Sequence, residues 1–144
     1  MFKPHAKSEE RKRSATVLIK YLLTAERPEA LPEHYRELLT VLLWKITEAE
    51  SKKYDTRFQS EGAVHRSSDT VLRHEHVFQR KKMIAELENA SVQEVDDILA
   101  KAVGCTVTLE EHVLLSKFDD DYGWDRYRKA GIRVVDTQTS EQII

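Results

Sequence analysis

The fold is organised by one stretch of sequence, YRELLTVLLWKITEA, at residues 35–49. Its apolar residues recur every three and four positions, at Tyr35, Leu38, Leu39, Leu42, Leu43, Ile46 and Ala49. This spacing predicts an α-helix with one apolar stripe, which we expect to be the centre of the core. Pro32 suits the first turn of this helix, because proline lacks the amide hydrogen that would have no intrahelical partner there.

An earlier segment, residues 8–25, also has helical periodicity. Its periodic apolar residues are Val17, Leu18, Tyr21 and Leu22. Only a short connection, bracketed by Pro28 and Pro32, separates the two predicted helices. Because helices joined by a short connection pack antiparallel, we expect an N-terminal helical hairpin.

The second half of the chain predicts shorter elements. We expect a loop at residues 55–70 with one short strand at 63–65, and an extended segment at 71–78. Predicted helices follow at 79–89, from Ser91, at 108–117 and around Trp124, and predicted strands lie at 105–107 and 132–135. We expect these last two strands to pair, and residues 1–7 and 137–144 to be frayed.

Two of the helix starts have the spacing of capping boxes, Ser91 with Glu94 and Thr108 with Glu111. In a capping box each side chain accepts a hydrogen bond from an otherwise unpaired backbone amide. Together these elements predict an α+β fold that is mainly helical, with a small two- or three-stranded sheet. A length of 144 residues suits a single domain.

The cysteine content indicates a reducing compartment. Cys105 is the only cysteine, so the chain has no internal disulfide and no thiolate zinc cluster, and we expect Cys105 to be a small buried residue. The first twenty residues carry charges throughout and have no apolar run of the kind that a signal peptide or membrane span requires. We therefore expect a cytoplasmic protein that does not engage a membrane.

The charges are unevenly distributed. Residues 66–82 contain five basic and two acidic residues, whereas residues 83–121 contain ten acidic and two basic ones. The basic stretch suits contact with the phosphates of a nucleic acid, while the acidic stretch would repel nucleic acid and suits a basic protein partner. Solvated helix faces without a partner would produce the same pattern.

A run of three residues, His74, Glu75 and His76, concentrates the chemistry of the chain. In an extended segment the two histidines point to one face and Glu75 to the other. Imidazoles two residues apart can ligate one divalent ion, and a neutral histidine can act as a general base. Hydrogen bonding to buried groups would also account for both histidines.

A second candidate group comes from the predicted helix at 108–117. His112 lies on the same side of this helix as Leu109 and Ser116, so we expect it to face inward. It could join the histidine run at a metal ion, with Glu110 or Glu111 as an oxygen ligand. An inward histidine that only donates a hydrogen bond to a buried carbonyl is the alternative.

The segment LRHEHVFQR, residues 72–80, resembles the first half of the HNH, or ββα-metal, nuclease motif. The resemblance implies a divalent metal, Mg²⁺, Mn²⁺ or Zn²⁺, bound by Glu75 and His112, and His76 as the general base that activates water. His74, beside Glu75 in the extended segment, is a further candidate ligand of this metal. The resemblance also implies phosphate contacts from a basic set, namely Arg73, Arg80, Lys81 and Lys82. Gln79 stands where the family commonly has proline. This departure from the motif would also fit an inactive descendant of the family.

These patterns lead to two functional expectations. The first is a divalent-metal phosphodiesterase acting on nucleic acid, an HNH-like endonuclease, or its inactive descendant. The second is a non-enzymatic helical protein whose acidic stretch binds a basic protein partner, and a third class is an oligomerising module that uses the stripe at 35–49. The nuclease expectation requires Glu75, His76 and His112 to lie within about 5 Å of one point, as direct metal ligation demands.

Overall fold

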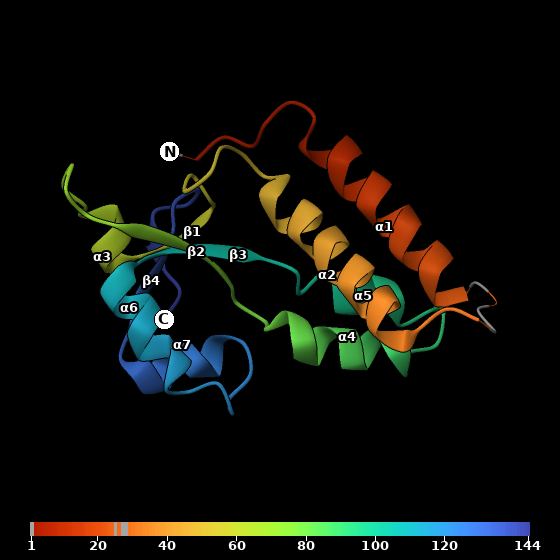
Figure 1. Cartoon of the computed structure of the whole chain (residues 1–144). Coiled ribbons are helices and arrows are strands. Elements are labelled where there is room, and N and C mark those ends of the chain that lie inside the picture. The colour runs from red at the N-terminus through yellow and green to blue at the C-terminus, as the bar shows by residue number, and fades with distance from the viewer. Residues whose placement is uncertain (1, 25, 27–28) are drawn as a thin grey trace.

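Two long antiparallel helices, α1 (Ser8–Thr24) and α2 (Pro32–Glu48), form the N-terminal part of the molecule (Figure 1). The computed structural model describes residues 2–24, 26 and 29–144, so the predicted end of the first helix at residue 25 lies outside the described residues. Pro32 occupies the first turn of α2, as predicted. Leu39, Leu43 and Ile46 of its apolar stripe are buried. The predicted helical hairpin is therefore confirmed.

A mixed five-stranded sheet follows, larger than the two- or three-stranded sheet that the sequence predicted. Its order is β2 (Leu72–His76), β3 (Gly104–Thr108), β1 (Phe58–Ser60), β4 (Val134–Asp136) and β5 (Glu141–Gln142). Strands β1 and β3 are parallel, and every other pair is antiparallel.

Three details of the predicted sheet were wrong. Residues 63–65 are not a strand. The strand in this region is β1, which leads into the short helix α3 (Glu61–Val64). The Ala63 amide of α3 donates to the Ser60 hydroxyl. Strands β3 and β4 do not pair, because β1 lies between them. Within residues 137–144, predicted to be frayed, β5 pairs with β4.

The remaining helices are α4 (Arg80–Glu88), α5 (Val95–Leu99), α6 (Leu109–Ser116) and α7 (Trp124–Ala130). The predicted capping box of Thr108 and Glu111 is present at the start of α6. At the other predicted box the Ser91 amide donates to the Glu94 carboxylate at 2.9 Å, but α5 begins only at Val95. Gly131, in the left-handed conformation with φ 69°, ends α7.

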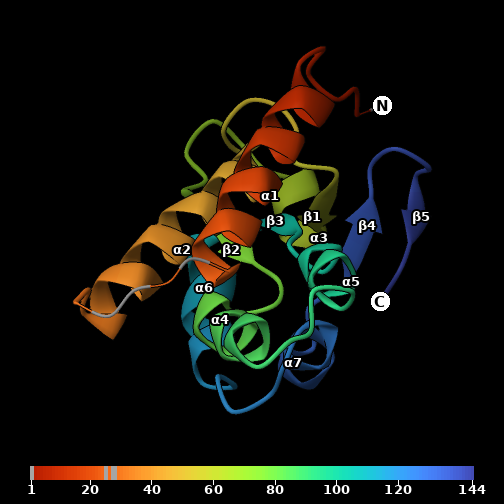
Figure 2. The same cartoon turned by 90° about the vertical axis from the view of Figure 1, so that its right-hand side faces the viewer.

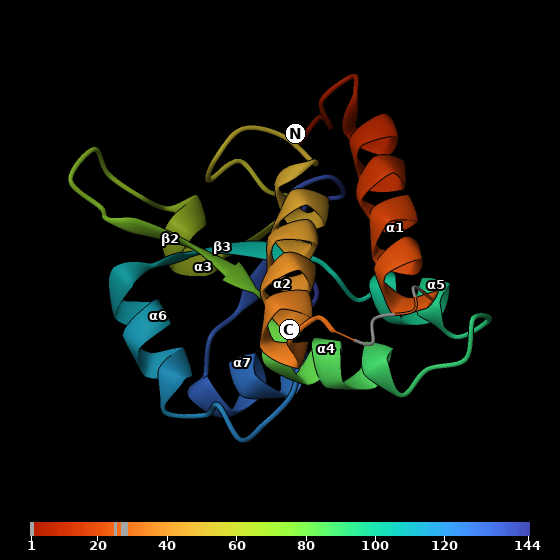
Figure 3. The same cartoon turned by 45° about the vertical axis from the view of Figure 1, so that its right-hand side comes forward.

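The hairpin, with α4 and α5, stands beside the sheet, and α6 and α7 lie below it (Figures 2 and 3). One core joins the hairpin to α4 and α5 through Ile19, Leu43, Met83 and Leu87. The other joins the sheet to α6 and α7 and contains Cys105, which is fully buried, together with Leu115 and Tyr127. None of the described helices is both long and apolar enough to cross a membrane.

Candidate functional site

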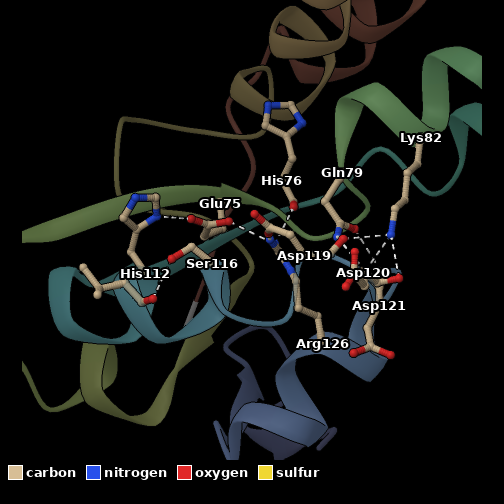
Figure 4. Close-up of polar contacts among 12 residues, drawn as sticks. Glu75, His76, Gln79, Lys82, His112, Ser116, Asp119, Asp120, Asp121 and Arg126 are labelled. Atoms are coloured by element: carbon tan, nitrogen blue, oxygen red, sulfur yellow. Dashed lines mark hydrogen bonds and ion pairs between the residues drawn. The ribbon is translucent and has the colours of Figure 1, made fainter.

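Strand β2 directs its alternate side chains toward different helices. The rings of His74 and His76 pack against Trp44 of α2, with ring centroids 5.1 and 4.4 Å from that of Trp44. The Glu75 carboxylate contacts α6 and α7 instead (Figure 4). The alternation follows from the extended backbone, in which successive side chains point to opposite faces.

Glu75 sits between an imidazole and a guanidinium. Its Oε1 atom makes a close contact with His112 Nδ1, and its Oε2 atom accepts a hydrogen bond of 3.0 Å from Arg126 (Figure 4). Arg126 is only 4% exposed and also donates to the His76 carbonyl and to the Asp119 carboxylate, each at 3.2 Å. The buried guanidinium is thus compensated by charge and hydrogen bonds, which a buried ion requires.

The contact with Glu75 orients the His112 ring. A carboxylate bound at Nδ1 leaves Nε2 to exchange protons, which is the arrangement that holds a histidine in place as a general base. The predicted inward orientation of His112 is partly met: its ring contacts Glu75 of β2, but its side chain is 44% exposed. Sequence reasoning did not identify Arg126, which lies 51 residues after Glu75 in the chain.

The two histidines of the opposite face share one hydroxyl. Thr47 Oγ1 lies 3.3 Å from the Nε2 atom of His74 and 3.3 Å from that of His76. Burial lowers the pKa of His74, and burial together with the nearby Arg80 cation lowers the pKa of His76 to about 3. Both imidazoles are therefore neutral at neutral pH.

Of the predicted metal and catalytic residues, the structure brings together Glu75 and His112. It directs His74 and His76 to the α2 face, so His76 and His112 do not meet at one point. Among the residues that the structure describes, no group of three or more histidine, cysteine, aspartate or glutamate side chains is placed to hold a metal ion. Glu111, a further ligand candidate, accepts hydrogen bonds from the Ser60 hydroxyl and the Thr108 amide.

The four predicted phosphate contacts occupy four different environments. The Arg80 guanidinium lies 4.7 Å from the Trp44 ring centroid. The Lys82 ammonium donates to the carbonyl oxygens of residues 119, 120 and 121 at 2.9, 2.9 and 3.1 Å, so it holds this turn (Figure 4). Lys81 is exposed, and Arg73 borders a cavity.

This cavity, of about 630 Å³, lies between the end of α2, the segment that follows it and β2. We call it the α2–β2 cavity. Thr47 and Thr56 are buried and form its polar floor with His74, whereas Lys52 and Lys53 are exposed at its rim. The remaining lining residues are Trp44, Glu48, Ser51, Tyr54 and Arg73.

The sequence prediction missed most of this cavity. The run Lys52, Lys53, Tyr54 directly after the predicted helix was a local signal for it, because cations next to an aromatic ring are common at anion-binding surfaces. Trp44 and Thr47 gave no such signal, since their positions on α2 are also typical of core packing.

The acidic stretch at 83–121 is partly neutralised within the chain. Five of its ten acidic side chains form ion pairs with residues that the structure describes, namely Glu86, Glu88, Asp96, Asp119 and Asp121. Their partners are Lys101, Arg36, Lys20, Arg126 and Lys129. Binding of a basic protein by this stretch stays a prediction, which charge reversal at Asp120 and a capture assay would check.

Comparisons of this chain with protein-family models, with curated proteins and with solved structures found no match.

Proposed function

We propose that this protein binds single-stranded nucleic acid through the α2–β2 cavity. The observation that carries the proposal is the meeting of three cations, Lys52, Lys53 and Arg73, at a concave site that also contains two aromatic rings. Its volume of about 630 Å³ falls within the range of about 300–1,000 Å³ that is usual for sites binding small organic groups. An unpaired nucleotide can enter such a cavity, whereas a duplex keeps its bases stacked inside the helix.

The charges of the cavity support an anionic ligand. Among the described residues, neither lysine of the rim is ion-paired, and Arg73 donates only to the carbonyl of Leu72 at 2.9 Å. Glu48 is the one acidic lining residue, and its Oε2 atom forms an ion pair of 3.6 Å with the Nζ atom of Lys45. The three cations are therefore free to replace the counterions of a phosphate backbone, which is the main source of affinity in such complexes.

The floor of the cavity supports recognition of an uncharged polar group. Burial lowers the pKa of His74, so its ring offers a neutral nitrogen beside the hydroxyls of Thr47 and Thr56. Tyr54, whose ring centroid lies 4.9 Å from the Lys53 ammonium, adds an aromatic surface at the rim. Cations that follow the backbone and rings that contact bases are the usual components of single-strand binding sites.

Binding is tested with a fluorescently labelled single-stranded oligonucleotide and a duplex of the same length, followed by anisotropy over a range of salt concentrations. The variant Lys52→Glu/Lys53→Glu is compared with Lys3→Glu/Lys117→Glu, which makes the same change of net charge at exposed lysines elsewhere. We expect only the first variant to lose affinity. The slope of its plot of log affinity against log salt concentration should become less negative by about 1.4, which is the contribution of two phosphate contacts on a single strand. Equal losses in both variants, or no binding by the unaltered protein, would contradict the proposal.

Metal-dependent cleavage is a separate prediction from the HNH resemblance. Glu75 and His112 supply two adjoining groups for it, and His76 faces the α2–β2 side. Arg73 and His74 belong to both predictions, but Lys52 and Lys53 belong only to the binding proposal and His112 only to the cleavage prediction, so variants at these residues test the two separately.

A further inference from the structure

The helical hairpin exposes a row of large apolar side chains to solvent. On α1 these are Val17, Leu18 and Tyr21, which are 59%, 49% and 68% exposed, and on α2 they are Leu38 and Val41, which are 52% and 51% exposed. We call these five residues the outer hairpin face. The opposite side of each helix is buried in the core, at Ile19 and Leu43.

The two halves of this face adjoin each other. Residues three and four apart lie on one side of a helix, so Leu18 and Tyr21 line up on α1, as Leu38 and Val41 do on α2. A groove between the helices is lined by Leu18 from α1 and by Leu42 and Lys45 from α2. Leu42 and Lys45 stand four residues after Leu38 and Val41, on the same side of α2, so this side of α2 adjoins Leu18 of α1. Figures 1 and 2 show α1 and α2 side by side at the surface of the molecule.

None of the five residues of the outer hairpin face lines the α2–β2 cavity, the nucleic-acid site proposed above, although Val41 stands only three residues before Trp44 on α2. Trp44 and Thr47, which line the α2–β2 cavity, are on the side of α2 that faces β2. Leu38 and Val41 are on a side of α2 that no other described element buries. An inference about this face therefore does not depend on the proposed function.

Opposite charges stand at the two ends of the outer hairpin face. Because α1 and α2 are antiparallel, the start of α1 lies beside the end of α2, where exposed cations predominate. Among the described residues, the unpaired cations there are Lys7, Arg11 and Arg13, against the acidic Glu9 and Glu10, and Lys45 is paired with Glu48. At the other end α2 begins with the exposed Glu33 and Glu37, while the nearby cations that the structure describes, Arg36 and Lys20, are paired with Glu88 and Asp96.

We propose that the outer hairpin face binds the same face of a second copy of this chain, with the hairpins antiparallel about a two-fold axis. The apolar rows then cover each other, and the basic end of each copy meets the acidic end of the other, so that Arg13 approaches the partner's Glu37. In a two-fold interface each contact occurs twice, and a surface with an apolar middle and ends of opposite charge is complementary to itself. Self-association requires this face to carry charges of both signs. Binding of a partner with a different sequence would not require both signs on this face.

The full-length protein tests the proposal by sedimentation velocity over a concentration series. We expect a species of twice the monomer mass that dissociates on dilution. The variant Leu18→Glu/Leu38→Glu should be monomeric, with an unchanged far-ultraviolet circular dichroism spectrum because both side chains are about half exposed. The control Val64→Glu/Val92→Glu places the same charges at exposed valines elsewhere and should remain dimeric.

A charge exchange tests the antiparallel arrangement without altering the apolar row. Arg13→Glu and Glu37→Arg should each weaken the dimer, and the double variant should restore it, because the two charges are then exchanged across the interface. Monomeric unaltered protein, or a dimer that survives Leu18→Glu/Leu38→Glu, would overturn the proposal. Failure of the double variant to restore association would overturn the antiparallel arrangement.

Discussion

The carboxylate of Glu75 contacts the imidazole of His112, which lies 37 residues later in the chain, while the next residue after Glu75 turns its ring to the other face of β2. The three residues of the predicted nuclease site are thus divided between two faces. One face carries a carboxylate, a half-exposed histidine and the buried Arg126. The other carries two neutral histidines beside a cationic cavity.

The ion pair of Glu75 and Arg126 should be important for stability. Glu75→Gln keeps the size of the side chain but leaves the guanidinium, which is 4% exposed, without its buried counter-charge. We expect the free energy of unfolding, measured by urea denaturation, to fall by about 3–5 kcal/mol. The matched change Asp125→Asn breaks an exposed pair with Arg128 and should cost less than about 1 kcal/mol. Similar losses in both variants would contradict the role assigned to the buried pair.

His76 should make stability depend on pH. Burial lowers its folded-state pKa to about 3, whereas an unfolded histidine has a pKa of about 6.5. Between these values the unfolded state binds more protons, so this group lowers stability as the pH falls from 6.5, by up to about 1.4 kcal/mol per pH unit. The difference in the free energy of unfolding between the unaltered protein and His76→Gln, measured from denaturation curves, should therefore become smaller as the pH decreases. A difference between the two proteins that stays the same over this pH range would contradict the role assigned to His76.

Gly104 should be required for the position of the His74 ring. A Cβ atom at residue 104 would lie 2.6 Å from His74 Cε1 and 2.7 Å from its Nε2, which is too close for non-bonded atoms. Gly104→Ala should cost about 1–3 kcal/mol of stability, as overpacking does, and should weaken oligonucleotide binding at the cavity. In a double-mutant cycle, His74→Ala should remove most of the stability cost of Gly104→Ala, because the clash is then absent. Strictly additive losses would show that the clash lies elsewhere.

Lys82 should act on the turn at 119–121 and not on phosphate. Lys82→Met removes three hydrogen bonds to backbone carbonyls, so we expect a loss of about 1–3 kcal/mol in stability and faster amide exchange in residues 119–123. Lys81→Met, at the exposed neighbour, is the control and should change neither quantity. A lower salt dependence of oligonucleotide binding in Lys82→Met than in Lys81→Met would restore Lys82 as a phosphate contact.

Cleavage of plasmid in the presence of Mg²⁺, Mn²⁺ or Zn²⁺ tests the HNH resemblance. Because His112 is the histidine that contacts Glu75, we expect metal-dependent cleavage to be lost in His112→Ala and retained in His76→Ala. The unfolding transition of each variant is measured as a control for folding. Absence of cleavage with every metal would contradict the nuclease prediction and would leave the binding proposal intact.

The parts of the fold that depend on local interactions could be predicted from the sequence. The periodicity at 35–49, the proline at the first turn of α2 and the capping box of Thr108 with Glu111 each involve residues close together in the chain. The separation of His74 and His76 from Glu75 also follows from the alternation of a single strand. These features appear in the structure as predicted.

Pairings between distant segments could not be predicted in the same way. The three-residue strand β1 has too few residues for a recognisable alternation, and its insertion between β3 and β4 depends on contacts across more than forty residues. The same limit applies to the candidate site, where Glu75 meets Arg126 only after the chain has passed through β3 and α6.

The sequence by itself determined the amphipathic hairpin, the cap of α6 and the alternation of β2, because each arises from backbone geometry and side-chain spacing within a few residues. Only the tertiary structure decided which helix each face of β2 would meet. Burial of apolar surface from segments far apart in the chain set that packing, and it placed His76 against α2 and Glu75 against α6 and α7.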